Sequence, residues 1–374
     1  MPSTPPPAHP RITGLNYVRP LGSGGFADVY LYEQDMPRRM VAVKVLKQPI
    51  VEARDRSDFE AEADAMARLS SHPSIISVFS AGISTDGKPY LTMEFCPDSM
   101  RDRTRGKPAP LHVVLDAGVR LAGALETAHQ AGILHRDIKP SNVLLATTGR
   151  PALTDFGISM LHGRASSEDK LNALSIPWSA PEVLSGATSG STASEIWSLG
   201  ATLYTFAAGF SPFELADPAK NTKTKMTARI QQAKYTPIEG AQGYEPFDEL
   251  MALAMQARPE QRFRSMQEFG EALRQLQRRY GFEVTPLDLV APSWVTPAAD
   301  NLGIRGPVIT TVRDTNRATQ RAQLHEQGLR ENTDGVVTRE RHISPLKAGL
   351  IGAAAAVLAI GGVLAAAIGF GWFG

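Results

Sequence analysis

The stretch HRDIKPSN at residues 135–142 decides the fold of this protein. It places Asp137, Lys139 and Asn142 at short, fixed spacings. DFG follows at residues 155–157, and APE at residues 180–182. Each motif alone is compatible with an ordinary turn or helix cap, but chance seldom produces the set in this order. The set therefore predicts one chemical site assembled from separate parts of the chain.

Upstream of this stretch, a glycine-rich turn precedes a lysine on a predicted strand. GSGGFA occupies residues 22–27 and VAVK residues 41–44. Backbone amides approach a triphosphate closely only where side chains are absent. Lys44 lies between Val43 and Val45, and a lysine in an apolar run needs an anion. We therefore expect a glycine flap over phosphates, with Lys44 beneath it.

The hydrophobic pattern predicts an α+β fold with two lobes. A small antiparallel β lobe with one helix is expected over residues 15–96, and a larger, mainly α lobe over 97–280. The expected strands are 15–21, 27–33, 40–47, 75–83 and 90–95, and the expected helices are 55–69, 111–130, 192–208, 249–257 and 266–280.

Composition limits what the chain can do. Its 374 residues carry a net charge of +1, which gives no bulk electrostatic reason to expect nucleic acid as a partner. The single cysteine, Cys96, excludes an intrachain disulfide and suits a reducing compartment.

With these motifs, residues 15–280 resemble the eukaryotic-like protein kinases, in particular the bacterial serine/threonine kinases anchored in a membrane. The resemblance implies ATP as phosphoryl donor, Mg²⁺ or Mn²⁺ as metal, and protein substrates. It also implies an ATP site formed by Leu21, Gly22, Ser23, Gly24, Gly25, Phe26, Val29, Ala42, Lys44, Met93, Glu94, Cys96 and Leu144.

The resemblance assigns a role to each polar residue of the site. Asp137 would accept the proton of the substrate hydroxyl, and Lys139 would neutralise the γ-phosphate. Asn142 and Asp155 would bind the metal. Lys44 would hold the α- and β-phosphates. Its expected ion-pair partner is Glu62, with Glu60 as the competing choice.

Three further pairings follow from the resemblance. Lys139 followed by proline is typical of serine/threonine specificity, and Ser175 would contact the catalytic aspartate. Glu182 and Arg262 would form a buried, structural ion pair. Arg136 would receive a phosphate from the activation segment, where Ser166 and Ser167 are the candidates. Thr310 and Thr311 are additional candidate autophosphorylation sites.

Three residues depart from the family pattern. Ala27 replaces a glycine of the flap at little expected cost. Glu195 replaces the usual aspartate that braces the catalytic loop, which puts that brace in doubt, and Leu174 replaces a glycine. Two alternatives stay open: a membrane-tethered pseudokinase that binds nucleotide and partners, and a small-molecule phosphotransferase of the same fold. The complete motif set argues against the first, and the APE segment against the second.

The two ends of the sequence suggest different structures. Residues 1–14 read as a disordered lead, and 281–346 as a flexible juxtamembrane linker. Residues 347–373 carry no charge after Lys347 and are long enough for one transmembrane helix. Arg339, Arg341 and Lys347 precede it, so we expect a single-pass protein of the cell membrane with a cytoplasmic kinase domain. Gly362 and Ala366 would permit a homodimer through this helix.

Overall fold

A computed structural model of the chain describes residues 9–25, 27–49, 53–156, 175–238 and 243–290, and the backbone of 329–331 and 337–339. The side chains of residues 53–55, 58 and 62 lie outside this description. The chain divides into two units, residues 1–297 and 298–374. In the second unit, β9 (Leu329–Glu331) and β10 (Val337–Arg339) form an antiparallel pair.

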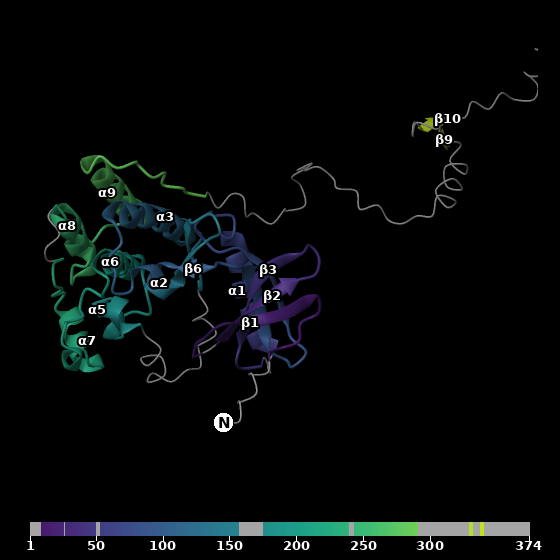
Figure 1. The fold of residues 1–374 in the computed structure, drawn as a ribbon, viewed down its shortest axis with the longest axis horizontal. Coiled ribbons are helices and arrows are strands. Elements are labelled where there is room, and N and C mark those ends of the chain that lie inside the picture. The colour runs from purple at the N-terminus through teal and green to yellow at the C-terminus, as the bar shows by residue number, and fades with distance from the viewer. Residues whose placement is uncertain are drawn as a thin grey trace, which may run out of the picture. The chain divides into compact units, whose positions relative to one another are not determined.

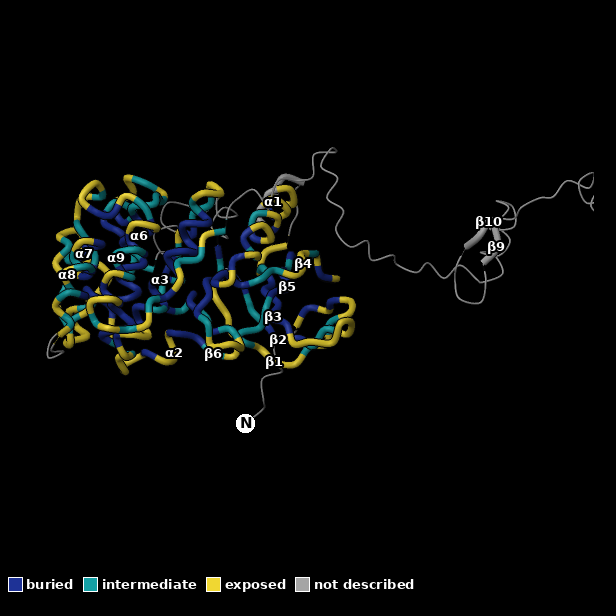
Figure 2. The backbone as a smooth tube through the Cα atoms, turned by 90° about the horizontal axis from the view of Figure 1, so that it is seen from above, coloured by how far each residue is buried: buried dark blue, intermediate teal, exposed yellow. Residues whose placement is uncertain are grey.

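The small lobe (Figure 1) is built on a five-stranded antiparallel sheet in the order β1-β2-β3-β5-β4, whose strands are labelled in Figure 2. Its elements are β1 (Leu15–Ser23), β2 (Ala27–Gln34), β3 (Arg39–Leu46), α1 (Ala53–Leu69), β4 (Val78–Ile83) and β5 (Pro89–Glu94). Each strand lies within a few residues of its expected position. The largest difference is at 75–77, where Ile75 makes only an isolated bridge to Leu153.

The side chains of β3 alternate between two hydrophobic clusters. Val41, Val43 and Val45 pack with Tyr30 and Tyr32 on one face of the sheet. Ala42 packs into the main core on the other face. Because successive strand residues point to opposite faces, Lys44 lies on the same face as Ala42, toward the interior.

Residues 9–14 differ from the disordered lead that we expected. Ile12 is buried in the small cluster of the sheet, and Tyr32 Oη donates a hydrogen bond to Pro10 O at 2.6 Å. His9 stacks on Tyr17 with ring centroids 3.9 Å apart. One buried apolar side chain, one hydrogen bond and one ring stack hold this segment against the sheet.

The large lobe is helical, and two nearly fully buried helices form its centre (Figure 2). These are α3 (Leu111–Gln130) and α6 (Thr192–Ala208), whose bounds match the expected ones. Among the described residues of this lobe, the other helices of eight or more residues are α7 (Lys223–Gln231), α8 (Glu245–Ala254) and α9 (Met266–Arg279). Short elements escaped the sequence analysis because they are too brief to show periodicity: β6 (Asp98–Ser99), β7 (Val143–Leu145), β8 (Pro151–Leu153), α2 (Met100–Thr104) and α5 (Pro181–Leu184).

Residues 281–290 are packed onto the large lobe, although we expected a flexible linker from 281 onward. Thr285 is buried, and its Oγ1 donates to Asp116 Oδ1 on α3 at 2.8 Å. Asp288 is so close to α3 that a Cβ added at Gly123 would lie 2.4 Å from its carbonyl oxygen. We call residues 281–290 the α3 strap. No helix within the described residues is long and apolar enough to cross a membrane, and the expected span at 347–373 lies outside them.

Candidate active site

The catalytic loop holds a strained backbone that a buried glutamate supports. Arg136 has a φ of 66°, a conformation that costs a non-glycine residue about 1 kcal/mol or more. Its amide donates to Glu195 Oε1 at 2.6 Å. The other oxygen of Glu195 contacts His129 Nε2 at 2.7 Å. Glu195 therefore does brace the loop, and His129 on α3 is a partner that we did not foresee.

Three polar side chains converge at the catalytic aspartate. Ser175 Oγ donates to Asp137 Oδ1 at 2.8 Å, and Lys139 Nζ lies 2.7 Å from Asp137 Oδ2. Lys139 also donates to Ser175 Oγ at 2.9 Å. Asn142 Nδ2 donates to the carbonyl and to Oδ2 of Asp137, at 2.8 and 3.1 Å. The carboxylate is thus oriented from three sides, as a group that accepts a proton requires.

An ion pair joins the two lobes. Lys44 Nζ lies 2.8 Å from Asp155 Oδ1, with 10% and 32% of the two side chains exposed. Burial alone would raise the pKa of Asp155, but the neighbouring positive groups, led by the charge and hydrogen bond of Lys44, together hold the pKa below its usual value. His135 and Lys139 act in the same direction. Asp155 therefore stays an anion, able to receive a cation.

The expected glutamate partner of Lys44 is only partly tested. The side chain of Glu62 lies outside the described part of α1. Glu60, the competing choice, forms an exposed ion pair with Arg56 at 2.9 Å, so it does not contact Lys44 in this structure. Lys44 pairs with Asp155 here.

The residues expected around the adenine come together in one cluster between the lobes. Ala42 and Met93 belong to the main hydrophobic core, and four partly buried residues pack against that core: Leu21, Val29, Cys96 and Leu144. The β3–β5 register places Ala42 opposite Met93 and Val41 opposite Glu94. Burial, and then the charge of Glu94, raises the pKa of Cys96 to about 12, so its thiol stays protonated. Phe26 lies outside the described residues.

The glycine-rich turn leaves room for phosphates. A Cβ added at Gly22 or Gly25 would meet no atom within 4 Å, so packing does not require glycine at either position. Lys47 ties the turn to β3, because its Nζ donates to Gly24 O at 2.6 Å. Sequence reasoning missed Lys47, although it lies three residues after Lys44. The open glycines and Lys44 fit a triphosphate.

Asn142 and Asp155 are suited to a divalent cation. Thr154 N donates to Asn142 O at 3.0 Å and so ties the two segments together. An amide oxygen and a carboxylate are the hard ligands that Mg²⁺ prefers. Within the described residues there is no group of three or more acidic, histidine or cysteine side chains that would bind a metal without help from substrate oxygens.

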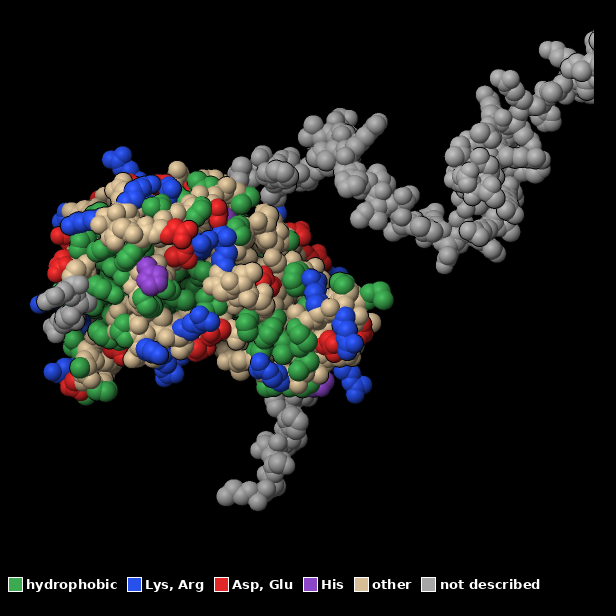
Figure 3. All heavy atoms as spheres, turned by 45° about the horizontal axis from the view of Figure 1, so that its top comes forward, with side chains coloured by type: hydrophobic (Ala, Val, Ile, Leu, Met, Phe, Trp, Pro, Cys, Tyr) green, Lys and Arg blue, Asp and Glu red, His purple; other side chains and the backbone are tan. Residues whose placement is uncertain are grey.

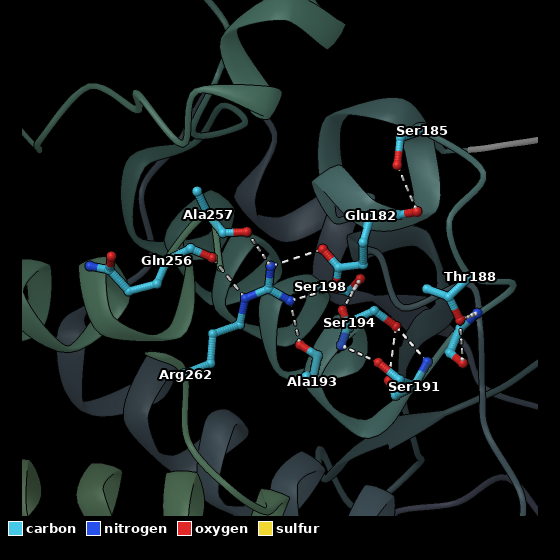
Figure 4. A network of polar contacts seen from close by, with 11 residues as sticks. Glu182, Ser185, Thr188, Ser191, Ala193, Ser194, Ser198, Gln256, Ala257 and Arg262 are labelled. Atoms are coloured by element: carbon cyan, nitrogen blue, oxygen red, sulfur yellow. Dashed lines mark hydrogen bonds and ion pairs between the residues drawn. The ribbon is translucent and has the colours of Figure 1, made fainter. Parts of the chain in front are cut away.

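A buried ion pair links α5 to the loop before α9 (Figure 4). Arg262 donates to Glu182 through two parallel bonds of 2.7 and 2.9 Å, and none of its side chain is exposed. Its remaining donors reach the carbonyls of Ala193, Gln256 and Ala257. The pair is fully hydrogen-bonded, so removing one partner would leave a buried charge and cost about 3–5 kcal/mol.

The expected regulatory residues are described only in part. The side chain of Arg136 is exposed, and no described carboxylate pairs with it. Ser166, Ser167 and Leu174 lie outside the described residues, so their roles stay predictions.

Fold and site together define a two-lobed phosphotransferase, and comparison with known proteins gives the family. The model of the protein kinase domain matches residues 15–272. The serine/threonine-protein kinase PknK of Mycobacterium tuberculosis is 37% identical over 292 residues, which is 76% of this chain and 25% of that protein. PknF of the same species is 32% identical over 280 residues, covering 70% and 56% of the two chains. PknJ is 33% identical over 274 residues, covering 70% and 45%.

The chain belongs to the protein kinase family, among its bacterial, eukaryotic-like serine/threonine members. It spans between about a quarter and just over half of the length of these curated relatives. The family uses ATP and a divalent metal.

Proposed function

We propose that this protein transfers the γ-phosphoryl group of ATP to serine and threonine hydroxyls of proteins. The observation that carries the proposal is the convergence on Asp137, where Ser175, Lys139 and Asn142 orient one carboxylate near the Lys44–Asp155 pair. A scaffold that only binds nucleotide would not need this arrangement. The complete set of polar groups therefore favours catalysis over the pseudokinase alternative.

Each side chain has a task in this reaction. Asp137 orients the substrate hydroxyl and takes its proton, while Lys139 balances charge that develops on the transferred group. Lys44 holds the phosphates from the floor of the small lobe. Asn142 and Asp155 would hold Mg²⁺ or Mn²⁺, which supplies charge neutralisation at the phosphate oxygens. Specificity for serine and threonine over tyrosine rests on Lys139 and Ser175.

The test is a phosphorylation assay with the purified full chain, ATP and Mg²⁺, followed by mapping of the phosphorylated residues. Lys44→Met and Asp155→Asn should abolish phosphate transfer. Lys88→Met serves as a matched lysine control, because Lys88 is only partly buried and pairs with Asp86 at 3.4 Å. We expect phosphoserine or phosphothreonine in the wild type and in Lys88→Met, and none in Lys44→Met or Asp155→Asn. Wild-type protein that binds ATP but transfers no phosphate would favour the scaffold.

We propose further that the chain phosphorylates its own activation segment at Ser166 or Ser167, and that the phosphate pairs with Arg136. A phosphoserine carries about −1.5 to −2 charges and suits an exposed arginine without a described carboxylate partner. Replacing both serines with alanine should lower the rate on an added peptide. Unchanged activity in that variant would remove this proposal.

A single carboxy-terminal anchor is the third proposal. The uncharged sequence after Lys347 and the basic residues before it support a span at 347–373, with the kinase unit in the cytoplasm and Gly362 available for pairing. Ala359→Arg, in the middle of the span, should move the protein from the membrane pellet to the supernatant, whereas Gln327→Arg should not. Equal sedimentation of both variants would count against the anchor, and an unchanged association signal for Gly362→Ile would count against pairing.

A further inference from the structure

A pocket of about 410 Å³ opens beside the catalytic loop. Lys139 and Ser175 line it, and both contact the carboxylate of Asp137. A substrate hydroxyl at Asp137 would therefore place neighbouring residues of the substrate in this pocket. The remaining wall comes from α2, from the end of α6 and from the residues after it.

The pocket has a marked excess of positive charge. Arg101 and Arg105 line it, are exposed, and have no side-chain partner among the described residues. They are four residues apart and so lie on the same side of α2 and its cap. Glu214 is the one carboxylate among the described residues that line the pocket, and it contacts the amide and hydroxyl of Ser211 at 3.4 and 3.3 Å. Two arginines thus remain available to an incoming anion.

The apolar part of the pocket wall is suited to contact the side chains of a peptide substrate, and not only an isolated anion. Trp178 and Phe210 line the same pocket, and Phe210 is 44% exposed. The indole of Trp178 is fixed by a hydrogen bond from Nε1 to Thr205 Oγ1 at 3.0 Å. Aromatic faces of this kind pack against the methylene groups of a peptide, while the arginines receive its carboxylates.

We propose that this pocket selects protein substrates in which carboxylate side chains flank the acceptor serine or threonine. The proposal rests on the kinase function proposed above and adds a substrate class to it. The sequence SSED at residues 166–169 is of this kind, because two candidate acceptors precede a glutamate and an aspartate. Exposed arginine–carboxylate contacts are individually weak, so two of them should change kcat/KM by about tenfold, and less at high salt.

The test compares two peptides with the full chain. One has the sequence of residues 164–172, RASSEDKLN, and the other carries Glu168→Gln and Asp169→Asn. The wild-type protein should prefer the acidic peptide by about tenfold in kcat/KM. The Arg101→Gln/Arg105→Gln double variant should bring the ratio of the two rates close to one. Arg103→Gln is the matched control, because Arg103 lies between them on α2 but pairs with Asp98 at 2.6 Å, and it should keep the preference.

A charge reversal provides a second readout. The Arg101→Glu/Arg105→Glu variant should phosphorylate a peptide with Glu168→Lys and Asp169→Lys faster than the acidic peptide. A variant that had lost its fold could not show this reversed preference. Equal rates of the wild-type protein on the acidic and neutral peptides would overturn the proposed substrate class. The same conclusion would follow if the protein phosphorylated itself but neither peptide. In both cases the kinase function would stand. A wild-type protein inert toward both peptides and toward itself would instead overturn the proposed function.

Discussion

At the scale of single residues, the main finding is how the catalytic loop tolerates Glu195. A longer side chain in place of the usual aspartate would be expected to push the loop away. Instead one oxygen accepts from the amide of Arg136, and the other contacts His129. The contact with His129 thus accommodates the longer side chain of Glu195. Glu195 is buried, with 2% of its surface exposed. The strained φ of Arg136, next to Asp137, depends on this contact.

This leads to a prediction for two variants at one position. Glu195→Ala removes the acceptor for Arg136 N and should lower the free energy of unfolding by about 1–3 kcal/mol. Because Asp137 then loses its fixed backbone, kcat should fall about tenfold with little change in the KM for ATP. Glu195→Gln keeps an oxygen for the Arg136 amide and should retain most of the activity. Steady-state kinetics checks this, and equal losses in the two variants would exclude the brace as the cause.

At the scale of elements, the α3 strap extends the kinase unit beyond its last helix. Two contacts hold Asp288 in place. Its carboxylate forms an ion pair with Arg150, and its carbonyl oxygen lies 3.0 Å from His72 Nε2. Val290 N donates to Thr127 Oγ1 at 3.2 Å. His72 lies in the loop that follows α1, the helix of the small lobe. The α3 strap therefore contacts both α3 of the large lobe and a loop of the small lobe.

The strap should respond to pH through His72. Its Nδ1 accepts from Ser74 N at 3.1 Å, so Nε2 donates to Asp288 O. Burial lowers the pKa of His72 below 6.5, and Arg150 acts in the same direction, although the hydrogen bond to Asp288 and the charge of that residue oppose them. The folded pKa is thus below the unfolded one, so unfolding takes up a proton as the pH falls below 6.5.

We therefore expect the contribution of His72 to stability to be complete above pH 6.5 and to be lost as the pH falls toward the folded pKa. Thermal unfolding of the full chain at about pH 7.5 and about pH 5.5 measures this loss. His72→Asn cannot titrate and should show a smaller drop in Tm between the two pH values. The same drop in both proteins would assign the pH dependence to other groups.

At the scale of the whole molecule, the two lobes of the kinase unit meet at the nucleotide site. Lys44 of the small lobe pairs with Asp155 of the large lobe. The face shown in Figure 3 carries acidic and basic side chains interspersed, in agreement with the net charge of +1. This face therefore carries no broad field of one sign, and substrate recognition rests on local groups, such as Arg101 and Arg105 in the pocket beside the catalytic loop.

Metal and nucleotide should stabilise the kinase unit by linking its lobes. A ligand at about 100 times its Kd adds about 2.7 kcal/mol to the folded state. We expect ATP with Mg²⁺ to raise the Tm of the wild-type chain, and a chelator to reverse the metal-dependent part. Asp155→Asn, which lacks the anionic ligand, should lose that part while still responding to ATP alone. A chelator effect of equal size in wild type and variant would rule out Asp155 as a metal ligand.

The two-lobed α+β fold could be predicted from the sequence, and so could the polar residues that the folded chain brings together around Asp137. Phosphoryl transfer restricts the side-chain types at Lys44, Asp137, Asn142 and Asp155, and their order along the chain is legible without coordinates. The long helices 111–130 and 192–208 were predictable for a similar reason, because their periodicity is local.

Only the tertiary structure revealed the partners of these residues. The amide of Arg136 meets Glu195 across 59 residues, and His72 meets Asp288 across 216. Residues 9–14 and 281–290 read as irregular ends, yet they pack on the domain through a few specific contacts. Such contacts leave no periodic signal, since they depend on which distant surfaces the folded chain brings together.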